Sequence, residues 1–348
     1  MKAQTLASRI EGGLARTTLN LPAALLRILA GRPVVLDGQT LDVQTQMLLR
    51  LQNLRGGAAL GGRAVERERA LMEGQCQLLE PGTEQPVETR EVKLAGGAGP
   101  LPARVYRPAA CPPKAGALVF YHGGGFVIGS VDSHDGVCRA LAERANCVVI
   151  SVEYRLAPEH PAPAGVEDAI ASFRDIVVRA DELGVDANRL AVGGDSAGGN
   201  LAAVVAQATR KDTVPPAFQL LFYPTVDFAK DRESVRTFAK GFLLEKSSMD
   251  WFRGHYIPES VDNSDPRVSP IYGDTSGVAP AIVITGGFDP LRDEGEAYAE
   301  AMKASGVDVT VSRKPTMIHG FLNFAGAVAG GDAALTEGAD ALARALQQ

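Results

Sequence analysis

The chain has 348 residues, with 41 acidic and 35 basic side chains and a formal net charge of −6. This acidic balance, without a basic cluster, argues against nucleic acid or an anionic membrane as the main partner. The N-terminal residues mix charges and lack the apolar core of a secretory signal, and no later run is long enough to span a membrane. We therefore expect a cytoplasmic protein without a stable membrane span.

The four cysteines, Cys76, Cys111, Cys138 and Cys147, are scattered and show no C-x-x-C spacing. Such a distribution indicates neither a zinc site nor a disulfide framework. The usual nucleotide signatures, G-x-G-x-x-G after a strand and the Walker A sequence, are absent as well. We therefore expect no metal ion and no organic cofactor.

The N-terminal part of the chain, residues 1–80, carries amphipathic helical patterns. The clearest are at 21–29, 43–54 and 64–71, with Asp42 as a candidate N-cap for the second. No residue here suggests chemistry, and the segment is short for an independent domain. We interpret it as a helical cap over a site formed elsewhere in the chain.

From residue 87 the pattern changes from helical to strand-like. Residues 87–94 and 101–107 flank a Gly-rich turn, which predicts an antiparallel hairpin at a sheet edge. Further strands are predicted at 117–121, 147–152, 190–193, 218–223, 281–285 and 307–312, and helices at 132–144, 166–180, 197–210, 293–305 and 332–347. This alternation predicts an α/β fold, in which a mostly parallel sheet has helices on both faces and the carboxyl ends of its strands at one edge.

The interval 225–278 breaks this alternation, because it has no strand pattern and is rich in aromatic residues and proline. We interpret it as a cap insertion that joins the N-terminal segment over the site, with simple core packing as the alternative. The α/β domain itself is then expected to comprise residues 81–224 and 279–348.

A serine lies at the centre of Gly194-Asp195-Ser196-Ala197-Gly198, which fits the pattern G-x-S-x-G. An apolar strand before it and an alanine-rich helix after it are the context of a nucleophile elbow, where the serine occupies a sharp strand-to-helix turn. Glycine is needed on both sides because a Cβ there would collide across the turn. The pentapeptide alone also fits a plain Gly-rich loop, but its context favours Ser196 as a nucleophile.

A serine nucleophile needs a base and a third group that holds the base, and in this kind of fold they follow in the order Ser, Asp or Glu, His. Of the five histidines, only His319 lies in a loop after a late strand. Asp289 directly follows the preceding strand, whereas Asp293 and Glu294 open a helix, where they are expected to compensate the helix dipole. We therefore predict a triad of Ser196, Asp289 and His319.

The run His122-Gly123-Gly124-Gly125 directly follows a predicted strand. Attack on an ester carbonyl places negative charge on its oxygen, and fixed backbone N–H donors stabilise that charge. Glycines let the backbone approach without a Cβ in the way. An HGGG run beside G-x-S-x-G is typical of lipases and esterases, and the N–H of Ala197 would be a further donor.

Together these stretches resemble the hormone-sensitive-lipase-like bacterial esterases of the α/β-hydrolase superfamily. The matching stretches are 121–125 (YHGGG), 153–161 (EYRLAPEHP), 194–200 (GDSAGGN), 289–295 (DPLRDEG) and 319–321 (HGF), in the order of the family. The resemblance implies an α/β-hydrolase fold with a helical cap, and a carboxylic-ester hydrolase that works through an acyl-serine intermediate. It also implies Gly124 and Gly125 as oxyanion donors beside Ala197.

The main functional hypothesis is hydrolysis of short- to medium-chain acyl esters. An amidase or deacetylase would use the same groups, and a small-ligand receptor on this fold typically lacks the histidine that is present here as His319. The resemblance makes a homodimer possible, paired through a sheet edge. The expected pocket side chains are Phe126, Phe242, Leu243, Trp251, Phe288 and Phe321.

Overall fold

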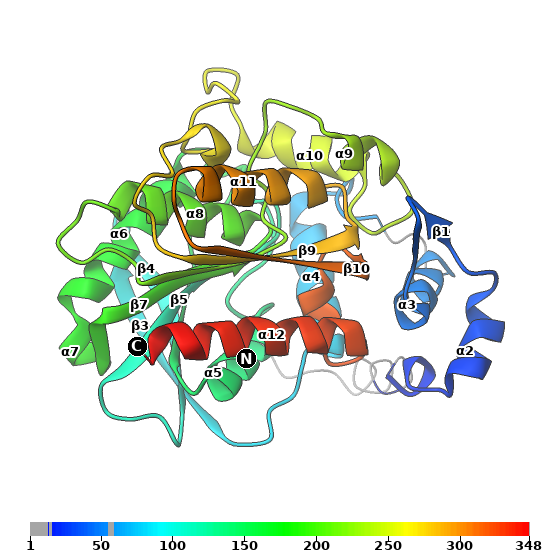
Figure 1. Cartoon of the computed structure of the whole chain (residues 1–348), viewed down its shortest axis with the longest axis horizontal. Coiled ribbons are helices and arrows are strands. Elements are labelled where there is room, and N and C mark those ends of the chain that lie inside the picture. Colours follow the sequence, from blue (N-terminus) through cyan, green and yellow to red (C-terminus); the bar gives the residue numbers. More distant parts are fainter. Residues whose placement is uncertain (1–12, 14–15, 55–58, 348) are drawn as a thin grey trace.

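The computed structural model of the chain describes residues 13, 16–54 and 59–347, and its core is one eight-stranded sheet (Figure 1). The strands, in the sheet order β10-β9-β8-β7-β5-β6-β4-β3, are Val309–Ile318, Ala281–Phe288, Phe218–Phe222, Val185–Asp195, Ala115–Tyr121, Val148–Val152, Pro100–Pro108 and Val87–Ala95. Neighbours from β6 to β10 are parallel, whereas β3 and β4 form an antiparallel hairpin that joins the sheet at β6. The predicted sheet and its edge hairpin are confirmed.

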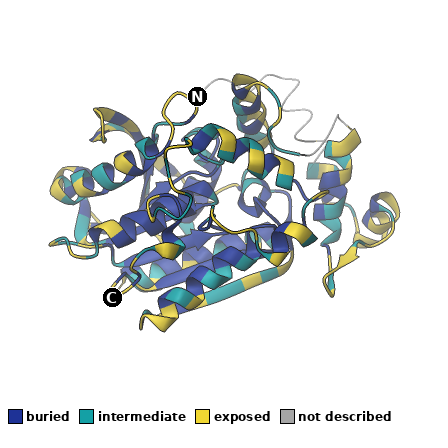
Figure 2. Ribbon diagram, turned by 90° about the horizontal axis from the view of Figure 1, so that it is seen from above, coloured by how far each residue is buried: buried dark blue, intermediate teal, exposed yellow. Residues whose placement is uncertain are grey.

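Helices cover both faces of the sheet (Figure 1). The helices are α5 (Asp135–Ala145) and α12 (Ala329–Leu346) on one face, and α6 (Ala164–Val178), α8 (Ala197–Thr209) and α11 (Arg292–Ala304) on the other, with the short α7 (Ala180–Leu183) after α6. In Figure 2 the central strands of the sheet are dark blue and the helices around them carry yellow residues on their outer faces, whereas the edge strand β3 is largely exposed. Burial on both faces explains why every residue of β5 is apolar or glycine.

Of the strands that extend beyond their predicted carboxyl ends, β9 and β10 extend the farthest. β9 includes Gly286 and Gly287 and ends at Phe288, and β10 extends to Ile318. The glycines allow close approach of the two strands, because a Cβ on Gly287 would lie 2.2 Å from the carbonyl oxygen of Pro315. Phe288 and Ile318 are the last pair of this ladder, so the next residue of each strand emerges at the same edge of the sheet.

Two further segments lie at the edge where the parallel strands end (Figure 1). The N-terminal segment contains α2 (Ala23–Ala30), β1 (Val35–Leu36), β2 (Gln39–Thr40), α3 (Val43–Leu54) and α4 (Val65–Leu79). The second segment, within 225–278, contains α9 (Glu233–Thr237), α10 (Lys246–Tyr256) and the 3-10 turn η1 (Pro270–Tyr272). Asp42 caps α3 as predicted, because its Oδ1 accepts the N–H of Thr45 at 2.8 Å. The N–H of Leu60 donates to the carbonyl of Leu243 at 3.2 Å, which joins the two segments.

Part of the predicted N-terminal cap segment, residues 1–12, 14–15 and 55–58, lies outside the described residues. As expected, the interval 225–278 forms no strand. Among the described helices, none combines the length and the apolar character needed to cross a bilayer.

Candidate active site

Ser196 lies at the sharp turn between β7 and α8. Its backbone has φ 54° and ψ −116°, a conformation that costs a residue with a side chain about 1–3 kcal/mol. A Cβ on Gly194 or on Gly198 would lie 2.3 Å or 1.8 Å from the carbonyl oxygen of Tyr121, so both positions require glycine. The turn expected from the G-x-S-x-G pattern is therefore present.

Ser196→Gly should be more stable than Ser196→Ala by about 1–2 kcal/mol in free energy of unfolding. Both variants lack the hydroxyl, but only alanine keeps the Cβ that makes this φ unfavourable, while the larger unfolded-state entropy of glycine offsets part of the gain. Urea titration of both variants measures the difference. Equal stabilities would show that the turn holds no backbone strain.

His319 and Asp289 are the residues that follow the last pair of the β9–β10 ladder. The Nε2 of His319 lies 3.0 Å from the Oγ of Ser196, and its Nδ1 lies 2.8 Å from the Oδ2 of Asp289. The second carboxylate oxygen, Oδ1, accepts the N–H of Leu291 at 2.8 Å. Asp289 is buried and His319 is only 5% exposed. The structure therefore brings the three residues of the predicted triad into one hydrogen-bonded line, largely shielded from water.

The glycine run after β5 borders the same site. Gly124 and Gly125 have φ of +118° and +60°, and both line a cavity together with Ser196. Within the residues that the structure describes, no protein acceptor is hydrogen-bonded to the backbone N–H of Gly124, Gly125 or Ala197. Ala197 is also the first residue of α8, where the helix dipole favours negative charge. Free N–H groups at such a place suit a developing oxyanion.

Gly124→Ala should lower kcat about 10²–10³-fold, the effect of losing an oxyanion donor. A Cβ at Gly124 would lie 2.1 Å from the carbonyl oxygen of Ile128, so the loop and its N–H groups must move. Gly254→Ala in α10 is the matched control, because its Cβ would meet nothing within 4 Å. Steady-state kinetics on both variants tests this; an unchanged kcat in a folded Gly124→Ala protein would exclude the loop from catalysis.

A buried polar network, which the sequence did not reveal, holds this loop. The Oδ1 of Asp195 accepts the N–H of Gly123 at 2.8 Å and lies 3.1 Å from the Nε2 of His134. Tyr223 lies at the other carboxylate oxygen, with its hydroxyl 3.4 Å away. Burial would raise the pKa of Asp195, but the attraction of His134 and the hydrogen bond from Gly123 hold that pKa below its usual value. Asp195 therefore anchors the glycine run as a carboxylate.

His122 braces the beginning of the loop. Burial, with a smaller contribution from the nearby His134, lowers the pKa of His122 to about 3, so its ring is neutral. The ring stacks on Tyr154 with 4.4 Å between centroids, and the Tyr154 hydroxyl donates to the His122 carbonyl at 2.8 Å. A buried, stacked and neutral imidazole therefore supports the loop from below the site, without contact to Ser196.

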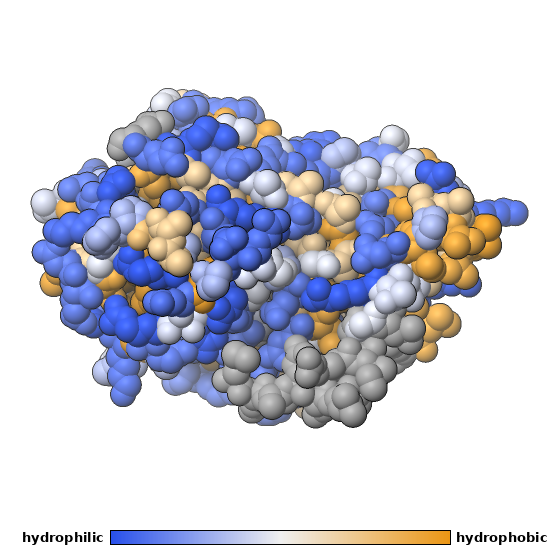
Figure 3. Space-filling model, turned by 90° about the horizontal axis from the view of Figure 1, so that it is seen from below, coloured by the Kyte–Doolittle hydropathy of each residue, from blue (hydrophilic) through white to orange (hydrophobic). Residues whose placement is uncertain are grey.

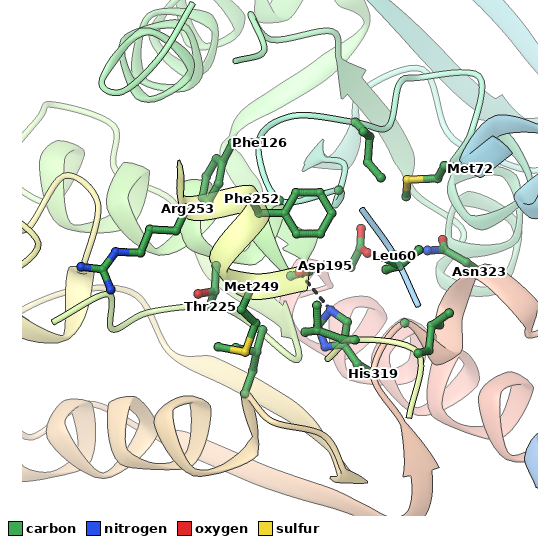
Figure 4. Close-up of a pocket in the computed structure, with 18 of the residues that line it drawn as sticks. Leu60, Met72, Phe126, Asp195, Thr225, Met249, Phe252, Arg253, His319 and Asn323 are labelled. Carbon is green, nitrogen blue, oxygen red and sulfur yellow. Dashed lines mark hydrogen bonds between the residues drawn. The ribbon is translucent and has the colours of Figure 1, made fainter. Parts of the chain in front are cut away.

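The cavity beside Ser196 is lined mainly by apolar side chains. Its walls include Leu60, Met72, Phe126, Leu243, Met249 and Phe252. Figure 4 shows Phe126 and Arg253 on one side, Met72 and Asn323 on the other, and His319 between the two sides. Side chains from α4 and from α10 therefore meet over the same space, although they are far apart in the sequence.

Two of the six side chains predicted for the pocket, Phe126 and Leu243, line this cavity. The others lie outside its lining. Phe242 and Phe288 pack against each other with 5.4 Å between ring centroids, and both belong to the core with Phe321. An aromatic-rich sequence marks buried packing as well as pockets, so composition could not separate these roles.

Trp251 is the fourth predicted residue outside the cavity lining, and its neighbour Phe252 lines the cavity instead. The indole packs over Gly61, where an added Cβ would lie 2.9 Å from the ring. Successive residues of a helix project about 100° apart, so Trp251 and Phe252 face different surroundings. The predicted pocket residue Trp251 therefore lies on α10, a helix that does line the cavity, but on a different face of it from Phe252.

Glu294 connects α11 to the start of the 225–278 insertion. Its Oε1 accepts the N–H of Val226 at 2.8 Å and the hydroxyl of Thr225 at 3.1 Å. Burial raises the pKa of Glu294 to about 8. The expected role in compensating the helix dipole is therefore incomplete: Asp293 stays partly exposed at the helix start, whereas Glu294 turns inward.

Glu294→Gln should be more stable than the wild type at about pH 9 and similar to it at about pH 5. The carboxyl titrates near 8 when folded, against 4.5 for the free group. The folded wild type therefore binds more protons between these values and loses stability as the pH rises through this window. Glutamine keeps an acceptor oxygen for Val226 without the charge. Urea titrations at both pH values test this; a stability difference that does not change with pH would contradict it.

Comparison with known proteins identifies the family to which the chain belongs. A family model described as alpha/beta hydrolase fold matches residues 118–323. The carboxylic ester hydrolase LipN of Mycobacterium tuberculosis is 45% identical over 319 residues, which cover 87% of this chain and 83% of LipN. The ethyl acetate hydrolase of Pseudomonas putida is 40% identical over 253 residues, 71% of this chain and 78% of that protein. The solved ester-hydrolase EH1AB1 from the Lake Arreo metagenome matches with a TM-score of 0.84 and 41% identity, covering 88% of this chain and 100% of that one. The chain therefore belongs to the α/β-hydrolase family, in its hormone-sensitive-lipase-like branch.

Proposed function

We propose that this α/β-hydrolase cleaves short- to medium-chain carboxylic esters through an acyl enzyme on Ser196. The observation that carries the proposal is the hydrogen-bonded line from the Ser196 hydroxyl through His319 to the Asp289 carboxylate, with separations of 3.0 Å and 2.8 Å. The similarity to LipN and to an ethyl acetate hydrolase supports the same reaction class.

In the acylation step the Oγ of Ser196 attacks the ester carbonyl carbon while the Nε2 of His319 takes the hydroxyl proton. The carbonyl oxygen becomes negative and accepts hydrogen bonds from the backbone N–H groups of Gly124, Gly125 and Ala197. When the tetrahedral intermediate collapses, its bond to the leaving oxygen breaks and the imidazolium gives that oxygen the proton. The alcohol departs, and the acyl group remains on Ser196.

Deacylation repeats these steps with water as the nucleophile. His319 takes a proton from the water, the oxyanion forms in the same place, and the Ser196 oxygen leaves with the proton that the imidazole returns. Asp289 stabilises the imidazolium in both halves of the reaction and holds Nδ1 as the donor. Its burial strengthens this interaction, because no water competes for the carboxylate.

We infer that the N-terminal segment and the 225–278 insertion form the cap over this site. Met72 on α4 and Phe252 on α10 both line the cavity, so each segment contributes to one apolar chamber. An apolar chamber favours an apolar acyl or alcohol group over a charged one. We also infer a cytoplasmic protein and a homodimer that pairs through β10, which is an edge strand of the sheet.

The proposed activity is tested with p-nitrophenyl acetate, butyrate, octanoate and palmitate, and with p-nitroacetanilide as the matched amide. We expect turnover of the acetate to octanoate esters, weak turnover of palmitate and little turnover of the anilide. Mass spectrometry after a rapid acid quench should find the acyl group on the peptide that contains Ser196. Turnover of the anilide at rates above those of the esters would assign the site to an amidase, and tight ligand binding without turnover would assign it to a receptor.

A further inference from the structure

A cluster of apolar side chains is exposed on α2 and β1, at the outer end of the N-terminal segment. Of the nine large apolar side chains that are exposed in the described part of the chain, five lie here: Leu25, Ile28, Leu29, Val35 and Leu36. Their exposed fractions range from 36% to 76%. Figure 3 shows orange surface gathered at the end of the molecule where Figure 1 places α2 and β1. We call these five side chains the α2 surface; such a cluster marks an interaction site.

Three exposed arginines lie around the α2 surface. Arg27 lies on α2 and Arg32 follows it, and a guanidinium nitrogen of Arg50 lies 3.3 Å from the place where a Cβ on Gly31 would be. All three arginines are exposed, and none forms an ion pair within the described ranges. The stretch 16–36 contains no acidic residue. The surface therefore combines apolar side chains with uncompensated positive charge.

The α2 surface is held firmly against the rest of the molecule. The side-chain amide of Gln46 on α3 donates to the carbonyls of Ala30 and Arg32 at 3.0 Å and 2.8 Å. Asp37, in the turn between β1 and β2, pairs with Arg292 at 2.6 Å, three residues after Asp289. The acidic group nearest to the surface in sequence is thus paired with Arg292, which it shares with Asp293, and these contacts fix the surface relative to the site.

We propose that the α2 surface docks on an anionic lipid surface. The apolar side chains would enter the boundary between headgroups and acyl chains, and the arginines would meet lipid phosphates. A second copy of the chain fits less well, because a symmetric contact would bring the arginines around this surface close to the arginines of the other copy. The net charge of −6 argued against an anionic membrane, but residues 16–36 contain no acidic residue, so the negative charge lies outside this stretch and would orient this end of the molecule toward lipid.

Docking would bring the cavity close to esters that are dissolved in lipid. The last turn of α3, the helix that supports α2, contributes Gln52 to the cavity wall. This use of the surface rests on the proposed esterase function, whereas docking itself does not. The two ideas can fail separately, because vesicle binding is measured without any ester present.

The test is co-sedimentation of the full chain with two kinds of vesicle, phosphatidylcholine alone and equal parts of phosphatidylcholine and phosphatidylglycerol. We expect binding to the anionic vesicles that weakens as salt is added. Ile28→Ser with Leu29→Ser should lower the partition coefficient at least about tenfold, because each CH₂ group that enters the membrane interface strengthens binding to the vesicle. Arg27→Gln with Arg32→Gln should lower it roughly fivefold for each arginine removed. Val178→Ser is the matched control, because Val178 is 83% exposed but lies on α6.

All four proteins should hydrolyse p-nitrophenyl acetate in buffer at the wild-type rate, which verifies that each is folded. Three results would overturn the proposal. The first is wild-type protein that stays in the supernatant with both vesicles. The second is vesicle binding that Val178→Ser weakens as much as Ile28→Ser with Leu29→Ser. The third is a dimer in analytical ultracentrifugation that the Ile28→Ser and Leu29→Ser changes dissociate, which would assign the α2 surface to a second copy of the chain.

Discussion

Replacing Ser196 with alanine should lower kcat for p-nitrophenyl butyrate about 10⁶-fold, because the acyl enzyme can no longer form. The change removes one hydroxyl at the end of β7 and leaves His319, Asp289 and the glycine run in place. The variant should still hydrolyse the ester about 10³–10⁴-fold faster than the uncatalysed reaction in water, because the oxyanion donors and substrate binding remain. Stopped assays at high enzyme concentration would quantify this residual rate against a buffer blank.

The control for this loss is Ser172→Ala. Ser172 is a buried serine on α6, away from the site, and its hydroxyl donates to the backbone carbonyl of Ala169 at 3.0 Å. It should retain wild-type kcat. The double variant Ser196→Ala with His319→Ala should be no slower than Ser196→Ala alone, since residues that act as one unit are not additive. A further large loss in the double variant would mean that His319 acts independently of Ser196.

The sheet and the positions of its catalytic loops were predictable because their signals are local. The apolar strand before Ser196 and the glycines around it constrain the turn directly, and the structure adds only the values of φ and ψ. The order of strands and helices likewise follows from periodicity. The triad of Asp289 and His319 with Ser196 was predicted from the order of these residues after successive strands. Their contact itself depends on the pairing of Phe288 with Ile318, thirty positions apart in the sequence, which only the structure shows.

The side chains around the site were less predictable, because the role of each depends on the direction in which it points and on how deeply it is buried. Phe252 and Trp251 are adjacent aromatic residues of one helix, and only the structure separates the one that lines the cavity from the one that packs on Gly61. His134 gave no sequence signal, because a histidine ahead of a helix is usually an exposed residue. Its contact with Asp195 depends on two loops that are distant in the sequence.

Replacing Asp289 with asparagine should lower kcat about 10⁴-fold, the loss that follows when a catalytic histidine is held in the wrong tautomer. The structure fixes the orientation of the new amide. The Oδ1 of Asp289 accepts the N–H of Leu291 at 2.8 Å, so the asparagine oxygen stays at that position. Its NH₂ group then points at the Nδ1 of His319 and donates to it. The imidazole proton moves to Nε2, which faces Ser196 and can no longer accept the hydroxyl proton.

Asp293→Asn provides the matched control, because Asp293 is the other aspartate of the same stretch and is four positions away. Its carboxylate pairs with Arg292 at 2.9 Å and accepts the N–H of Ser234 at 2.8 Å, with no contact to His319. We expect less than about a tenfold change in kcat for this variant, consistent with a partly exposed charge interaction. Steady-state kinetics and urea titration of both variants separate catalysis from stability. Equal losses of kcat in the two variants, or a fully active Asp289→Asn, would remove Asp289 from the triad, because only Asp289 controls which imidazole nitrogen carries the proton.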